Sequence, residues 1–128
     1  MGRKVLIAED ELHIRLLIEQ SLEELEDEDV ELFMASNGEE ALEVARQEHP
    51  ELVLLDVMMP KVNGFEVCEQ IRSDPAIADM HIILLTAKGQ EYDRRRGDEV
   101  GANQYMTKPF NPDELLSNVR AAIGLNED

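Results

Sequence analysis

The sequence predicts a doubly wound α/β domain built around a five-stranded parallel sheet. Five short apolar runs of strand length alternate with longer segments whose apolar residues recur at helical spacing. The strand runs are almost continuously apolar, which is typical of parallel strands covered on both faces. The chain has 128 residues and is 43% hydrophobic, which is enough for one domain with one core. We therefore expect a single domain over residues 1–128, without an attached output domain.

The first two strand–helix rounds occupy the first fifty residues. Strands are predicted at Lys4–Ala8 and Val30–Ala35. The intervening helix is expected over Glu11–Leu25, with apolar residues at helical spacing, namely Leu12, Leu16, Ile18, Leu22 and Leu25. The second helix is predicted to begin at about Glu39, after an Asn-Gly pair, and to end before Pro50.

The remaining three rounds follow the same order. Strands are predicted at Leu52–Leu55, His81–Leu85 and Tyr105–Thr107. A helix opened by Gly64 stops at the Ser-Asp-Pro break that begins at Ser73. The next helix, over Gln90–Val100, is highly charged and ends at a glycine. The last begins with Asn111 as N-cap and Pro112 at the first helical position, and runs to about Ile123.

The composition narrows the classes of partner. The formal net charge is −17, which repels phosphate backbones and anionic lipid, so neither direct nucleic-acid binding nor membrane binding is expected. The single cysteine, Cys68, excludes an internal disulfide and reads as a core residue. No apolar run has the length of a membrane span, and no signal peptide is apparent. We expect a cytoplasmic protein.

Polar residues follow three of the predicted strands. Glu9 and Asp10 follow the first strand, Asp56 ends the third, and Lys108 follows the fifth. In sheets of this type the carboxyl ends of the strands form the ligand-binding edge. A carboxylate at the end of a buried strand is costly unless it is paired or used. The sequence therefore predicts one polar site at this edge.

The chemistry of that site has more than one interpretation. Three carboxylates drawn together repel, and a hard divalent cation such as Mg²⁺ or Mn²⁺ relieves the repulsion; alternatively, Glu9 and Asp10 only cap the following helix. Lys108 alone is equally consistent with a salt bridge, and Thr86 at the fourth strand end with a simple β-former. Taken together, a metal, an ammonium and a hydroxyl around Asp56 suit phosphoryl transfer to that carboxylate.

Several segments carry a family resemblance along essentially the whole chain. They are Val5-Leu6-Ile7-Ala8-Glu9-Asp10-Glu11, Asp56-Val57-Met58-Met59-Pro60 with Gly64, Leu84-Leu85-Thr86-Ala87, Gly101-Ala102 and Tyr105-Met106-Thr107-Lys108-Pro109-Phe110. In this order and spacing the chain resembles the receiver domain of two-component response regulators. The resemblance implies a flavodoxin-like fold with strand order 2-1-3-4-5.

The resemblance also implies a role for each matching residue. Asp56 is the implied phosphoacceptor, which takes its phosphoryl group from a phosphohistidine of a sensor kinase or phosphotransfer protein. The implied Mg²⁺ ligands are Glu9, Asp10, Asp56 and the backbone carbonyl of Met58, although aspartate is very common at position 9. Thr86, Lys108 and Tyr105 are the implied phosphoryl-contacting and switch residues. The remaining positions are Gly64 and a cis Pro109, with structural roles, and Met58 and Lys88, which tune loss of the phosphoryl group.

Two other functions compatible with this type of fold find less support in the sequence. A flavin-binding module requires a Ser/Thr/Gly-rich phosphate loop after the first strand, where this chain has Glu9 and Asp10. A Mg²⁺-dependent phosphatase of the haloacid dehalogenase type also uses a strand-end aspartate. It requires a second acid two residues later, where this chain has Met58.

The basic run Arg94–Arg96 lies in the predicted fourth helix. It reads either as a solvated face paired with neighbouring acids or as a docking surface. The resemblance implies an output surface for a downstream protein on the face formed by the fourth helix, fifth strand and fifth helix. Asp98, after Gly97, replaces the apolar residue usual in regulators that dimerise through this face. We therefore expect a monomer or a weak dimer.

Overall fold

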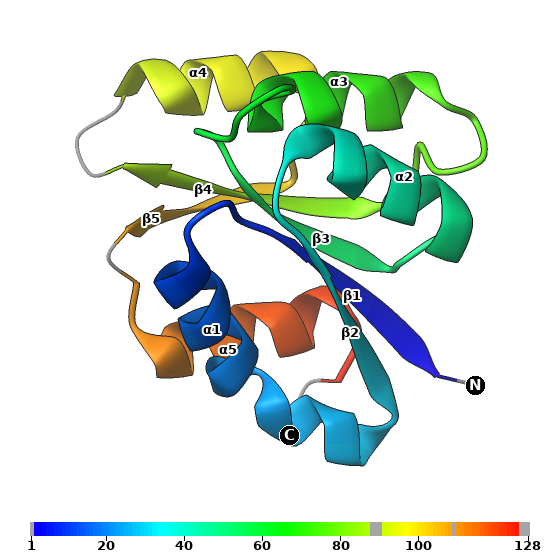
Figure 1. The fold of residues 1–128 in the computed structure, drawn as a ribbon, viewed down its shortest axis with the longest axis vertical. Coiled ribbons are helices and arrows are strands. Elements are labelled where there is room, and N and C mark those ends of the chain that lie inside the picture. The colour runs from blue at the N-terminus through cyan, green and yellow to red at the C-terminus, as the bar shows by residue number, and fades with distance from the viewer. Residues whose placement is uncertain (1, 88–90, 109, 126–128) are drawn as a thin grey trace.

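A computed structural model describes residues 2–87, 91–108 and 110–125. It confirms the predicted parallel sheet, with strand order β2-β1-β3-β4-β5 (Figure 1). The strands are β1 Arg3–Ala8, β2 Val30–Ala35, β3 Leu52–Asp56, β4 His81–Ala87 and β5 Gln104–Lys108. The helices are α1 Leu12–Ser21, the 3₁₀ helix η1 Glu23–Glu28, α2 Gly38–Glu48, α3 Gly64–Ser73, α4 Glu91–Val100 and α5 Pro112–Ala122.

Helices cover both faces of the sheet. Helices α1 and α5 lie on one face, and α2, α3 and α4 lie on the other (Figure 1). Alternate residues of each strand enter the two separate core clusters, as the period-two geometry of strands requires. The core is almost entirely aliphatic, and β1, β3 and β4 each carry four apolar residues that are fully buried. This explains why their sequences are continuously apolar.

Asparagine side chains fix the start of three helices. Asn37, Asn63 and Asn111 each accept a hydrogen bond from a backbone N–H in the first turn of α2, α3 and α5. At α3 the cap is reciprocal, because the Glu66 carboxylate also accepts from the Asn63 N–H. The predicted N-cap at Asn111, with Pro112 behind it, is confirmed.

The first helix differs from the prediction. It ends at Ser21, and residues 23–28 form the tighter η1, which is tied to α5 by ion pairs from Arg120 to Glu24 and Glu28. The helix carries two apolar stripes. Ile18 and Leu22 face the core, whereas Leu12 and Leu16 are 57% and 45% exposed. Helical spacing alone does not say which of two stripes is buried.

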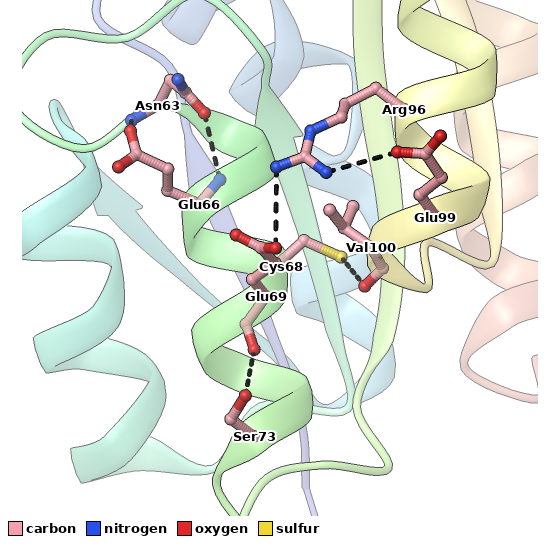
Figure 2. Close-up of polar contacts among 8 residues, drawn as sticks. All are labelled: Asn63, Glu66, Cys68, Glu69, Ser73, Arg96, Glu99 and Val100. Atoms are coloured by element: carbon pink, nitrogen blue, oxygen red, sulfur yellow. Dashed lines mark hydrogen bonds and ion pairs between the residues drawn. The ribbon is translucent and has the colours of Figure 1, made fainter.

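Cys68 is a core residue, as predicted. Its Sγ lies in α3 and donates to the Val100 carbonyl of α4 at 3.3 Å (Figure 2). Burial raises the pKa of the thiol to about 11, so little reactive thiolate forms at neutral pH.

Candidate functional site

The sheet register brings the predicted acidic residues together. Ala8 pairs with Leu55, and Asp56 pairs with Leu85, so the ends of β1, β3 and β4 reach the same edge. Glu9, Asp10 and Asp56 each present a carboxylate oxygen, and these oxygens lie within 4.8 Å of one another. Glu9 and Asp56 are buried, whereas Asp10 is exposed. The cluster is therefore buried on one side and open to solvent on the other.

Lys108, from the end of β5, completes the charged site. Its Nζ donates to Asp56 Oδ1 at 2.8 Å and lies 3.1 Å from Glu9 Oε1. Glu9 is also held by β2 and by its own loop. Its backbone N–H donates to the carbonyl of Ala35 at the end of β2, and its Oε2 accepts from the Glu11 N–H at 3.2 Å. One ammonium thus faces two buried carboxylates.

Burial determines the electrostatics of this group. Burial, and secondly the negative charge of Asp56, raises the pKa of Glu9 to about 7. Burial also raises the pKa of Asp56, against the opposing effect of Lys108. For Lys108, burial lowers the pKa, but the pairs with Asp56 and Glu9 outweigh it and the pKa is raised overall. The site therefore holds more negative charge than one ammonium neutralises.

The donor set fits a hard divalent cation. It contains only carboxylate oxygens, which Mg²⁺ and Mn²⁺ prefer. Glu9 Oε1 is buried, and among the described residues it has the ion-pair contact with Lys108 at 3.1 Å but no assigned hydrogen bond. A cation between Glu9, Asp10 and Asp56 would satisfy that oxygen and relieve the repulsion.

The remaining predicted site residues divide between two faces of the sheet. Thr86 is 3% exposed and follows the residue that pairs with Asp56. It shares a face with Tyr105, on the α3 and α4 side, whereas Lys108 lies on the opposite face with Met106. Met58 is 76% exposed, so its side chain extends into solvent. Lys88 and Pro109 lie outside the described residues.

Gly64 is required by the backbone that carries Asp56. Its N–H donates to the Val57 carbonyl at 3.0 Å, and a Cβ at this position would lie 2.5 Å from the Asp56 carbonyl oxygen. Any larger residue would displace the end of β3 that carries Asp56. The structural role that the resemblance implies for Gly64 therefore has a direct steric cause.

Two supporting residues were not predicted from the sequence. Arg15 reaches back from α1 and donates to the Glu9 carbonyl at 2.8 Å, which steadies the loop carrying the acidic pair. Gly38 lies so close to the loop after β3 that a Cβ would meet the Val62 carbonyl oxygen at 1.7 Å. Spacing gave no indication of the Arg15 contact. The Asn-Gly pair indicated the start of a helix. It did not indicate that Gly38 lies against the loop after β3.

Comparison with known proteins identifies the class. Residues 5–120 match the family described as response regulator receiver domain. The chain belongs to this family.

Curated relatives are transcriptional regulators. The chain is 46% identical over 120 residues to "Probable transcriptional regulator ycf27" of Pyropia yezoensis, covering 94% of this chain and 47% of that protein. It is 42% identical over 127 residues to "Alkaline phosphatase synthesis transcriptional regulatory protein PhoP" of Bacillus subtilis, covering 99% of this chain and 51% of that protein. The chain thus spans about half the length of the curated relatives it matches.

Solved structures agree with the fold and family. A putative response regulator from Chloroflexus aurantiacus superposes with a TM-score of 0.87 at 31% identity, covering 97% of this chain and 99% of that chain. The receiver domain of the Pseudomonas aeruginosa sensor histidine kinase PA1611 gives a TM-score of 0.86 at 27% identity, covering 97% and 99%. That structure is described with a magnesium ion coordinated in the active site cleft.

Proposed function

We propose that this domain is a signalling switch that accepts a phosphoryl group on Asp56 from a phosphohistidine of a sensor kinase or phosphotransfer protein. The observation that carries the proposal is the buried Asp56 carboxylate, 2.8 Å from Lys108 and clustered with Glu9 and Asp10. Receiver family membership supports phosphorylation-dependent signalling as the role of the domain.

The transfer makes one bond and breaks one. An Asp56 carboxylate oxygen attacks phosphorus as the donor's N–P bond breaks, and the imidazole leaves with the bonding electron pair. Lys108 offers its ammonium to the phosphoryl oxygens, and it is already held at Asp56 before the donor arrives. Glu9, Asp10 and Asp56 would hold Mg²⁺, and the ion would neutralise charge on the transferring group. The Met58 carbonyl is the implied backbone ligand of that ion.

The conformational response to phosphorylation involves Thr86 and Tyr105, on the side of the sheet covered by α3 and α4. A phosphoryl group on Asp56 carries at most two negative charges, in place of the single charge of the carboxylate, and three acceptor oxygens. The Thr86 hydroxyl, one residue beyond the β4 partner of Asp56, moves toward that group. Tyr105 then turns inward into the space beside Thr86 on the same face. The output is a changed surface over α4, β5 and α5, which binds a downstream protein.

A surface for the phosphodonor also lies at the site edge. Leu12 and Leu16 of α1 are 57% and 45% exposed, and Met58, two residues after Asp56, is 76% exposed. A protein donor has to reach the open edge where α1 begins. Exposed leucines beside such an edge favour an apolar contact with the donor.

The expectation that nucleic acid is not a partner is limited by the comparisons. The relatives are named as transcriptional regulators, so exclusion of nucleic acid is not supported for proteins that contain such a domain. For these 128 residues it rests only on the net charge of −17. No helix in the described ranges 2–87, 91–108 and 110–125 is long and apolar enough to cross a bilayer. A single receiver domain in the cytoplasm, as monomer or weak dimer, remains our prediction.

Phosphorylation by a small-molecule donor tests the proposal. We expect acetyl phosphate to add one phosphoryl group, seen by intact mass spectrometry, with Mg²⁺ but not with EDTA. Asp56→Asn keeps the size of the side chain and should remain unmodified. An equal adduct on Asp56→Asn, or none on the wild type, would refute the proposal. Turnover of a generic phosphoester, or visible flavin absorbance, would instead favour the phosphatase or flavin alternative.

A further inference from the structure

The part of α4 whose side chains the structure describes, residues 95–100, makes mainly polar contacts. Of residues 95–100, the only buried apolar side chain is that of Val100. Arg96 of α4 reaches toward α3 and lies 3.6 Å from Glu69 and 3.4 Å from Glu99 (Figure 2). Its guanidinium also lies 6.0 Å from the ring centroid of Phe65. Exposed ion pairs contribute at most about 1 kcal/mol each, so no single one of these pairs fixes the position of this part of α4.

A second set of contacts ties α4 to β5 through Tyr105. The tyrosine ring packs against Gly97, where a Cβ would lie 2.8 Å from Tyr105 Cε1 and 3.0 Å from Leu84 Cδ1. The Tyr105 hydroxyl donates to the Asp98 carboxylate. Gly97 thus receives the ring and Asp98 receives the hydroxyl. We call these two residues the tyrosine seat.

The tyrosine seat lies on the same side of the sheet as Thr86. Thr86 pairs with Thr107, and Tyr105 is two residues earlier on β5, so Tyr105 and Thr86 are diagonal neighbours on one face. Thr86 is buried, whereas the Tyr105 hydroxyl ends at the exposed Asp98. A tyrosine that turns inward beside Thr86 has to give up its bond to Asp98.

We propose that Asp98 is a positioning residue that holds Tyr105 in the resting arrangement and so opposes the phosphorylated state. The proposal rests on the proposed function in one respect, namely that Tyr105 turns inward when Asp56 is phosphorylated. A contact made only in the resting state lowers the fraction of molecules ready for the switched state. The apparent affinity for a ligand of the switched state falls in proportion.

Asp98→Ala tests the positioning role, with Glu99→Ala as matched control. Both variants remove one exposed carboxylate from α4, but Asp98 accepts a hydrogen bond from the tyrosine hydroxyl, whereas Glu99 pairs with Arg96. The first readout is the χ1 rotamer population of Tyr105, measured by NMR without ligand. We expect Asp98→Ala to shift that population and Glu99→Ala to leave it unchanged. An unchanged population in Asp98→Ala would overturn the proposal whether or not the domain is phosphorylated.

The second readout is the affinity for beryllofluoride with Mg²⁺, measured by calorimetry. A related receiver domain is described as activated by BeF3. We expect Asp98→Ala to bind about fivefold tighter than wild type, the effect of one hydrogen bond. Tyr105→Phe should bind equally tightly, and the double variant no tighter than either single one. Additive effects of the two substitutions, or weaker binding by Asp98→Ala, would contradict the positioning role. A wild-type domain that does not bind beryllofluoride would instead contradict the proposed function.

Discussion

Replacing Glu9 with glutamine should make the metal-free domain more stable at pH 8. The Glu9 side chain is fully buried, and burial raises its pKa from 4.5 to about 7. A raised pKa means that the folded state holds the proton more tightly than the unfolded state. The stability from this group is therefore complete below about pH 4.5 and is lost as the pH rises through about 7.

The size of the effect follows from the shift in pKa. At 1.36 kcal/mol per unit, a change from 4.5 to about 7 corresponds to on the order of 3 kcal/mol in the free energy of unfolding. Because Asp56 contributes to the shift, this is an upper limit for a substitution at one residue. Glu9→Gln removes the charge and keeps the size, so it should stabilise at pH 8 and change little at pH 4.5.

Urea unfolding in EDTA at several pH values measures this directly. Wild type should lose stability between pH 4.5 and 8, and Glu9→Gln should lose less. Mg²⁺ at pH 8 should stabilise wild type more than Glu9→Gln, because the variant lacks one anionic metal ligand. If Glu9→Gln were less stable than wild type at pH 8 in EDTA, with the same pH dependence, the assignment of Glu9 as a buried, destabilising charge would be wrong.

Three further changes have defined outcomes. Met58→Asn should speed loss of the phosphoryl group by about fivefold to tenfold, since an amide orients the attacking water through a hydrogen bond that methionine lacks; a slower variant in an intact-mass time course would contradict this. Lys61→Gly should raise the free energy of unfolding by about 0.5–1 kcal/mol, because Lys61 has φ +69°, whereas Lys61→Ala keeps that strain and should not. Leu16→Glu should slow transfer from a phosphohistidine protein by about tenfold, because one apolar contact with the donor is lost. Labelling by acetyl phosphate should be unchanged. An equal loss of rate with both donors would exclude a docking role for Leu16.

Much of the fold was predictable because local patterns and global topology agree. The continuous apolar runs that define β1 and β3 are buried on both faces. The N-cap Asn111 and the first residue of α3, Gly64, mark helix starts through local backbone chemistry. The first helix was less predictable. Leu12 and Leu16 have the same spacing as buried residues, and only tertiary packing selects Ile18 and Leu22 for the core.

The candidate site was predictable to the extent that strand ends define it. Glu9, Asp56 and Lys108 directly follow or end strands, so topology alone brings them to one edge. The contacts of Arg15 with the Glu9 carbonyl and of Asp98 with Tyr105 were not predictable. Both depend on where a helix lies over the sheet and on a single side-chain rotamer. Neither quantity leaves a periodic signal in the sequence.

The most direct test of the central claim identifies the atom that carries the phosphoryl group. Borohydride reduces an acyl phosphate to an alcohol and releases phosphate, so a phosphorylated aspartate becomes homoserine. After treatment with acetyl phosphate and Mg²⁺, peptide mass spectrometry should find homoserine at position 56. It should be absent when EDTA replaces Mg²⁺. Homoserine at another aspartate, or a phosphoryl adduct that yields none at position 56, would contradict the role of Asp56 as phosphoacceptor.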